Sequence, residues 1–218
     1  MSSLVNDLEA ISTILTESYG PAFLNSARDI YFLKYGKPAW DEPFYETRMN
    51  LFIEWFLLEY SPEGVEAPIL RALNLLKTNQ ELTKTVNSLY ASHYSLFDIE
   101  APWKNKHQYL RDTIYGGDWY VYIDPEIPAL DLPVLLQGRL IRNSDGITLS
   151  ESCIVHPSDA RDRIYELLDE SQSTPVAEVL ELLARLYIRR WRFPALPSSR
   201  FYDPQDPLVR DIVKRTRT

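Results

Sequence analysis

The sequence contains little cysteine, glycine and histidine, and each shortage excludes a class of site. One cysteine, Cys153, is present among 218 residues, so no disulfide can form within the chain, as is typical of a reducing cytoplasm. The seven glycines form neither a GxGxxG nor a GxxxxGK loop, which excludes the common phosphate-binding motifs. The three histidines are scattered and no HxxxH or CxxC spacing occurs, so no metal site is predicted.

An export signal and a long apolar run are also lacking. The first ten residues, MSSLVNDLEA, hold two acids and no Lys or Arg, so the positive region of a secretory signal is missing. The longest apolar run is interrupted by Glu54 and Glu59, and it is shorter than the roughly 20 residues of a membrane-spanning helix. We therefore expect a soluble, cytoplasmic protein that does not associate with membranes.

The composition is that of an ordinary globular protein, with 45% hydrophobic and 25% charged residues. The 15 prolines fall mostly between periodic segments, and no long disordered linker is evident. We predict a single compact unit over residues 1–218 with four sub-regions. These are helices in 1–94, antiparallel strands in 95–156, helices in 157–192 and a surface tail in 193–218.

Apolar residues are densest in the segment FYETRMNLFIEWFLLEY, residues 44–60. Eight of the ten residues from 49 to 58 are apolar, and they cover nearly every direction around a helix. One stripe comprises Met49, Phe52, Ile53, Phe56, Leu57 and Tyr60, and a second comprises Leu51, Trp55 and Leu58. The pattern predicts a central helix that is buried on most sides, with Asp41 as its N-cap.

Helical periodicity also predicts helices over residues 3–18, 21–35, 65–76 and 80–91, and later over 158–170 and 174–192. Between them the apolar period changes to two, over 95–100, 118–124, 134–141 and 147–155. Gly116–Gly117 and residues 143–146 read as hairpin turns. The fold class is therefore α+β, with about five N-terminal helices, about five strands in a small curved antiparallel sheet or open barrel, two C-terminal helices and an extended basic tail.

Four distinctive segments lie between residues 44 and 170: FxxW-F-L-L-x-Y, Ser-Leu-Phe-Asp-Ile, Gln-Gly-Arg-Leu-Ile and Ile-Val-His-Pro. Together they resemble an uncharacterised bacterial protein family with an aromatic central helix followed by a small β-rich segment. The resemblance implies the same order of helices and strands and no established activity. Some relatives end in a Cys/His-rich zinc motif, which this chain lacks, so no cofactor is implied.

Candidate catalytic residues have stronger structural explanations. Cys153 and His156 face opposite sides if they share a strand, so we expect a buried structural thiol and a histidine at the strand end. Glu54 interrupts the central helix, and an ion pair with Arg48 or another arginine, or a hydrogen bond, is the expected reason. The acids Asp112, Asp118, Asp124, Glu126 and Asp131 could line one rim of the sheet and hold a cation, but acidic loops are usually only solvated. No catalytic residue, metal ligand or cofactor is predicted.

The charge is unevenly distributed. The net charge is −8, yet residues 185–218 hold nine Lys/Arg and only three acids. In RLYIRRWRF, residues 185–193, arginines that suit phosphates alternate with aromatic rings that can stack on bases. The candidate macromolecule-binding residues are Arg189, Arg190, Trp191, Arg192, Lys214, Arg215 and Arg217, together with Tyr120 and Tyr122 on the outer face of the sheet. The favoured alternative is that Leu186, Tyr187 and Trp191 are buried helix residues, and that the neighbouring arginines bind the acidic remainder or offset the helix C-terminal dipole.

Three functional classes follow. The first is a cytoplasmic, non-enzymatic interaction or regulatory protein of the adaptor type, with another protein as the favoured partner. The second is a nucleic-acid-binding protein that uses the basic C-terminal segment, which the net charge disfavours. The third is a hydrolase with an unrecognised acidic site. The sequence leaves the pathway and the oligomeric state open.

Overall fold

The computed structural model describes residues 3–42, 44–102, 104, 106–122, 132–144, 146–150, 152–191, 193–203 and 205–207. Helices precede a group of strands, and further helices follow, so the predicted α+β class is confirmed. The chain divides into two compact units: unit 1 comprises Met1–His93 and Leu140–Ser152, and unit 2 comprises Tyr94–Arg139 and Cys153–Thr218. That residues 1–218 form one compact unit stays a prediction.

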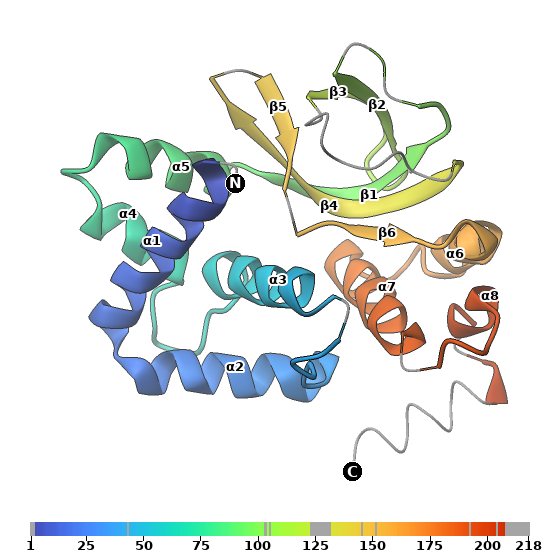
Figure 1. The fold of residues 1–218 in the computed structure, drawn as a ribbon, viewed down its shortest axis with the longest axis horizontal. Helices are drawn as coiled ribbons and strands as arrows, with labels where there is room; N and C mark the ends of the chain where they lie inside the picture. Colours follow the sequence, from blue (N-terminus) through green and yellow to red (C-terminus); the bar gives the residue numbers. More distant parts are fainter. Residues whose placement is uncertain are drawn as a thin grey trace. The chain divides into compact units, whose positions relative to one another are not determined.

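Helices make up most of unit 1 and are drawn in blue to green in Figure 1. They are α1 (Ser3–Tyr19), α2 (Pro21–Tyr35), α3 (Tyr45–Leu58), α4 (Pro68–Leu75) and α5 (Gln80–Tyr90). All five predicted N-terminal helices are present. The prediction that Asp41 caps the central helix is wrong, because Phe44 occupies the N-cap position of α3 and makes no side-chain cap.

The central helix α3 is enclosed as predicted. No residue from 49 to 58 is exposed, and Phe52, Phe56 and Leu57 are buried. The Tyr31 ring of α2 lies 5.4 Å from Phe52 and 5.2 Å from Trp55, so aromatic contacts join α2 to α3. The core of unit 1 is therefore built around this helix.

The sheet of unit 2 is assembled from strands β1 (His93–Ile99), β2 (His107–Asp112), β3 (Asp118–Tyr122), β4 (Val134–Asn143) and β6 (Ile154–His156). Strand β1 pairs with β2 and β4, β3 pairs with β2, and β6 pairs with β4. In unit 1, β5 (Gly146–Leu149) pairs with the last residues of β4. The pairings of β1 with β2, β2 with β3, and β4 with β5 and β6 are antiparallel.

The segment expected to form one strand over 147–155 contains two. Strand β5 ends at Leu149 and β6 begins at Ile154. The buried Ser150 hydroxyl donates a hydrogen bond to Glu54 of α3 and accepts one from the Ser152 amide at 3.0 Å. These side-chain bonds replace the strand ladder at this point.

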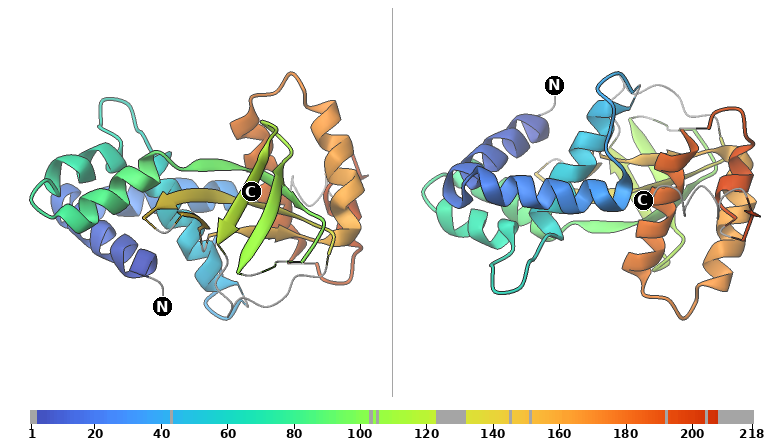
Figure 2. Two further views of the ribbon diagram at one scale, coloured as in Figure 1. Left: turned by 90° about the horizontal axis from the view of Figure 1, so that it is seen from above. Right: turned by 90° about the horizontal axis from the view of Figure 1, so that it is seen from below.

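Helices cover one face of the unit 2 sheet. They are a 3₁₀ turn η1 (Ser158–Ala160), α6 (Arg161–Glu170), α7 (Val176–Arg190) and α8 (Ser198–Phe201). Their core residues pack with Leu96 of β1 and Leu135 of β4. Figures 1 and 2 show the β2–β3 hairpin on the side of the sheet away from α7 and α8.

The prediction of a surface tail beginning at residue 193 is wrong for its first part. Phe201 and Tyr202 are 1% and 0% exposed and belong to the core of unit 2. The aromatic residues of this segment lie among prolines and follow neither a helical nor a strand period, so the sequence pattern did not predict their burial. Residues 208–218 of the predicted tail lie outside the described residues.

Truncation of Phe56 to alanine should destabilise unit 1 by about 3–5 kcal/mol. The ring is buried among other aromatic side chains, so its removal loses apolar burial and leaves a cavity in the core. The control is Leu33→Ala on α2, whose side chain is 84% exposed, for which we expect a change within about 0.5 kcal/mol. Urea unfolding followed by tryptophan fluorescence measures both. Equal effects of the two substitutions would contradict the assignment of α3 as the core helix.

Candidate functional site

The β2–β3 hairpin has one buried and one exposed face. In its register His107 lies opposite Tyr122, Tyr109 opposite Tyr120, and Arg111 opposite Asp118. Burial alternates along β2, with odd-numbered residues exposed and even-numbered residues buried. Because side chains alternate across a strand, every one of these opposed pairs points outward.

The inward face fixes the hairpin to the rest of unit 2. Gln108, Leu110 and Val121 are at most 4% exposed. The Gln108 amide donates hydrogen bonds to the Ala101 carbonyl at 2.8 Å and to the Tyr109 carbonyl at 3.0 Å, so the polar side chain is satisfied where it is buried. The hairpin is therefore anchored along its inner face.

The outward face carries a set of contiguous rings that we call the aromatic strip: His107, Tyr109, Tyr120 and Tyr122. The ring centroids of Tyr109 and Tyr120 are 5.9 Å apart, and His107 lies 5.9 Å from Tyr122 and 6.4 Å from Tyr120. Tyr120 is 69% exposed, and the two other tyrosines are 39% and 37% exposed. The rings contact one another across the strands while a large part of each faces solvent.

A fixed turn holds the two strands in register. The Asp112 carboxylate accepts hydrogen bonds from the Ser95 hydroxyl at 2.7 Å and from the Ile114 and Tyr115 amides at 2.9 and 3.0 Å. Gly116 and Gly117, with φ of 76° and 96°, complete the turn in conformations that other residues rarely adopt. The strip is thus presented on a backbone that is already ordered.

Charged residues lie at both ends of the aromatic strip. Lys104 forms an isolated antiparallel bridge with His107, and Arg111 lies beyond Tyr109, opposite Asp118. Lys106, with φ of 63°, adopts a left-handed backbone conformation that is uncommon for residues other than glycine. Hydrogen bonding to Asp118 raises the pKa of Tyr109, because the carboxylate favours the protonated phenol.

The structure brings together part of the predicted site and adds residues that sequence reasoning missed. Tyr120 and Tyr122 are exposed on one face, as the alternation of 118–124 predicted. His107 and Tyr109 of the same face, and Lys104 beside them, were missed. The alternation in HQYLRD was the available signal, but it identifies the outward residues only once the register to β3 is known.

The described basic residues of the predicted C-terminal site have partners within unit 2. Arg190 donates from Nε to the Ser198 hydroxyl, and its guanidinium lies 4.7 Å from the ring centroid of Trp191. The Trp191 ring in turn packs edge to face with Tyr187 at 6.0 Å. Arg189 is half-buried near the end of α7. Arg192, Lys214, Arg215 and Arg217 lie outside the described residues.

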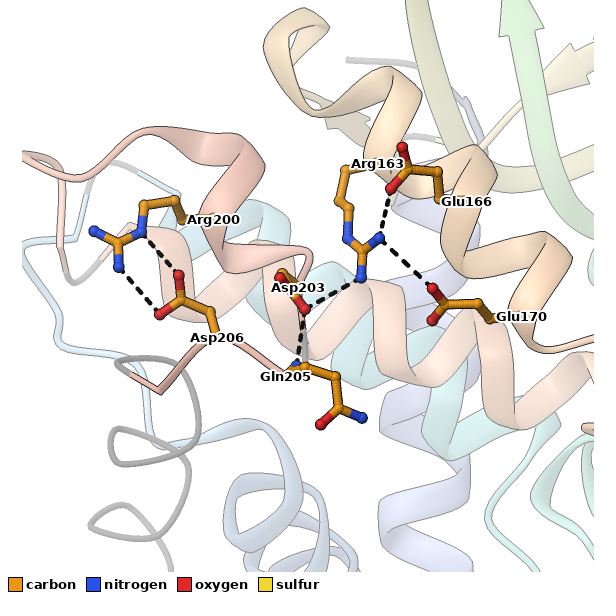
Figure 3. Close-up of polar contacts among 7 residues, drawn as sticks. All are labelled: Arg163, Glu166, Glu170, Arg200, Asp203, Gln205 and Asp206. Atoms are coloured by element: carbon orange, nitrogen blue, oxygen red, sulfur yellow. Dashed lines mark hydrogen bonds and ion pairs between the residues drawn. The ribbon is translucent and has the colours of Figure 1, made fainter.

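Acids neutralise further arginines in this region, as Figure 3 shows. Arg163 of α6 contacts Asp203 at 3.1 Å, and also Glu166 and Glu170 at 2.5 and 3.7 Å. Arg200 pairs with Asp206 through two nitrogens at 2.9 and 3.1 Å. The structural explanation of the basic segment holds in part: Leu186 and Tyr187 are buried as it expects, whereas Trp191 is 40% exposed.

His156 belongs to a buried chain of hydrogen bonds rather than to a catalytic pair. Its Nδ1 lies 2.8 Å from the Tyr202 hydroxyl, and its Nε2 lies 3.1 Å from Gln137 Oε1. The Gln137 amide nitrogen donates to the Leu180 carbonyl at 2.8 Å and to the Tyr94 hydroxyl oxygen at 2.6 Å. We call these residues the polar chain: Tyr94, Gln137, His156 and Tyr202.

The polar chain determines the tautomer of His156. Leu180 supplies a carbonyl, which only accepts, so the Gln137 nitrogen must face it and Oε1 must face His156. His156 therefore donates from Nε2 and accepts from Tyr202 at Nδ1. Complete burial lowers the pKa of His156 to about 3 and raises that of Tyr202, so both stay neutral.

Of the two other candidate catalytic residues, Cys153 is less buried than expected and Glu54 has a structural partner. Cys153 lies between β5 and β6 and is half-buried rather than fully buried. The buried Glu54 accepts from Ser150, whereas Arg48, its predicted partner, contacts Glu42 at 2.5 Å and the Gly36 carbonyl. A hydrogen bond, one of the two expected explanations for Glu54, is therefore present.

Acidic residues do not gather into a cation site within the described part of the chain. Asp112 accepts hydrogen bonds within the hairpin turn, and Asp118 is exposed. The other three predicted acids lie outside the described residues: Asp124, Glu126 and Asp131. Asp98 accepts from Arg161 and from the Tyr165 hydroxyl, each at 2.7 Å. Among the residues described, no group of three or more His, Cys, Asp or Glu could hold a metal ion.

None of the described helices is long and apolar enough to cross a membrane. Comparison with known proteins found no matching family model, no matching curated protein and no matching solved structure. The resemblance of residues 44–170 to an uncharacterised bacterial family therefore stays a prediction from the sequence.

The buried His156 should make unit 2 sensitive to acid. Below about pH 6.5 the unfolded chain protonates this imidazole while the folded protein does not. The free energy of unfolding should therefore fall by up to about 1.4 kcal/mol per pH unit as the pH decreases from about 6.5 towards about 3, in addition to the effect of carboxylates.

Urea unfolding of the wild type and His156→Gln between about pH 4 and about pH 7 measures this contribution. The substitution should lower stability near neutral pH and remove this part of the slope. Leu33→Ala is the control, because its side chain is exposed and does not titrate, so the slope should be unchanged. Parallel curves for the wild type and His156→Gln would show that His156 is not held neutral.

Proposed function

We propose that this chain is a non-enzymatic interaction protein of the adaptor type that acts in the cytoplasm, and that the outward face of the β2–β3 hairpin is its binding surface. The exposure of the aromatic strip carries the proposal. Tyrosine combines a large apolar ring with a polar hydroxyl, and aromatic residues are enriched where proteins bind other macromolecules. The strip joins four such rings on one face.

The ordered backbone of the hairpin supports this assignment. Binding is weakened by the loss of conformational freedom in the groups that must become ordered, and a surface that is already fixed avoids most of that loss. Here the Asp112 turn and the buried Gln108, Leu110 and Val121 fix the strands before any partner binds.

The buried acids give the hydrolase hypothesis less support than the exposed rings give the interaction hypothesis. The buried carboxylates of Asp98 and Asp112 in unit 2, and of Glu54 in unit 1, each accept hydrogen bonds from neighbouring side chains or amides. Such bonds satisfy the polar oxygens of these side chains where they are buried. An interaction surface explains why the rings of the aromatic strip are exposed and lie outside the core.

Tyr120→Ser should weaken partner binding without unfolding the protein. Tyr120 is the most exposed ring of the strip, so the free energy of unfolding should change by no more than about 0.5 kcal/mol. Loss of an aromatic anchor at an interface should weaken binding by a factor of about ten or more. Co-purification from the native cell, quantified for one recovered macromolecule, measures the difference.

The matched control is Tyr90→Ser on α5 of unit 1, a tyrosine that is 59% exposed outside the hairpin. It should retain the same macromolecule at the wild-type level. Recovery that is equal for Tyr120→Ser and the wild type, or lost equally in both variants, would show that the hairpin face is not the binding surface.

A further inference from the structure

We infer that the aromatic strip binds single-stranded RNA, with bases stacked on its rings and phosphates near the cations at its ends. This inference rests on the proposed function, since it names the partner of the same surface. Three observations carry it: the spacing of the exposed residues, the local sign of the charge, and the hydroxyl and imidazole groups among the rings.

The spacing of the exposed residues suits an unstacked strand. Three rows follow one another along the hairpin: Lys104, His107 and Tyr122; then Tyr109 and Tyr120; then Arg111 and Asp118. Residues two apart on a strand are separated by about 6.6–6.8 Å, roughly twice the 3.4 Å rise per nucleotide of a duplex strand. Bases can therefore occupy successive rows only if they are separated from one another, as in a single strand.

The local charge is opposite to that of the whole chain. Among the described residues from 100 to 122, the exposed charged groups are Lys104, Lys106 and Arg111 against Glu100 and Asp118, a small positive excess. Arg111 also lies 3.7 Å from Glu100, with both side chains more than half exposed, so this contact can yield to a phosphate. The chain as a whole carries −8, but charges beyond about 8 Å are largely screened at physiological salt.

Stacking favours nucleic acid over an acidic peptide as the occupant. Every base presents a flat aromatic face, and base stacking on an exposed aromatic ring is a recurrent way to bind single strands. An acidic peptide would use the lysines and leave the rings of Tyr109 and Tyr120 without matching groups. The hydroxyls of Tyr120 and Tyr122 and the His107 imidazole can bond 2′-hydroxyls, which RNA has and DNA lacks.

The test is fluorescence anisotropy of a labelled oligouridine of about 12 nucleotides with the full chain, a length within the range of single-strand sites. We expect binding in the micromolar range at about 50 mM salt that weakens as the salt is raised to about 200 mM. Oligothymidine of the same length should bind more weakly, and a duplex should bind more weakly than either. Equal or tighter binding of oligothymidine would overturn the assignment of RNA.

Variants locate the binding to the strip. The combined substitution Tyr109→Ser and Tyr120→Ser should weaken oligouridine binding roughly 5- to 150-fold, the range expected for loss of stacking on one base, because the two rings lie in one row. Lys104→Ala should reduce the salt dependence, whereas Tyr90→Ser should bind as the wild type does. Binding that the double substitution leaves unchanged, or no binding at about 100 µM protein and about 50 mM salt, would overturn the inference.

The two proposals can fail separately. If oligouridine does not bind, yet a purified protein recovered from the native cell binds directly to the wild type and not to Tyr120→Ser, the interaction surface stands and RNA is the wrong partner. If neither binds in a way that depends on Tyr120, both proposals are wrong.

Discussion

The amide of Gln137 is buried in unit 2, and the packing of that unit depends on the polar chain built around it. The polar chain connects three strands: Tyr94 lies on β1, Gln137 on β4 and His156 on β6. It also includes Tyr202, from the segment after α8, and the Leu180 carbonyl of α7 accepts a hydrogen bond from Gln137. A buried polar group left without a partner costs about 1–3 kcal/mol, so these elements must meet in one arrangement. That requirement draws the segment after residue 193 into the core, although its composition suggests a surface tail.

The same sheet gives the hairpin two different faces. Strand β1 belongs to the core through Leu96 and pairs with β2, and Asp112 of β2 accepts from Ser95 of β1. The inner residues of β2 and β3 are therefore held, and the period of two leaves the remaining rings outside. Rigid support on one side and exposed aromatic area on the other are the two properties that a binding surface needs.

Charge in this protein has separate roles in separate places. In the C-terminal half of unit 2, arginines meet carboxylates of the same unit, as with Arg163 and Asp203 or Arg200 and Asp206 (Figure 3). The first pair joins α6 to the segment after α8, and the second joins α8 to that segment. On the hairpin, Lys104 and Lys106 are exposed beside exposed rings. Clusters of basic residues in a sequence therefore indicate less about binding than the surroundings of each cation do.

The sequence by itself determined the five N-terminal helices, the two longer C-terminal helices, most of the strands and the identity of the core helix. Periods of 3.6 and two are local properties, and the density of apolar residues in 49–58 requires enclosure wherever α3 lies. Outward placement of Tyr120 and Tyr122 followed from the same alternation. Only the tertiary structure decided that Ser150 would interrupt the strand by bonding to Glu54, that Tyr202 would reach His156, and that His107 and Tyr109 would join Tyr120 and Tyr122. These outcomes depend on register and on partners distant in sequence, which no local pattern encodes.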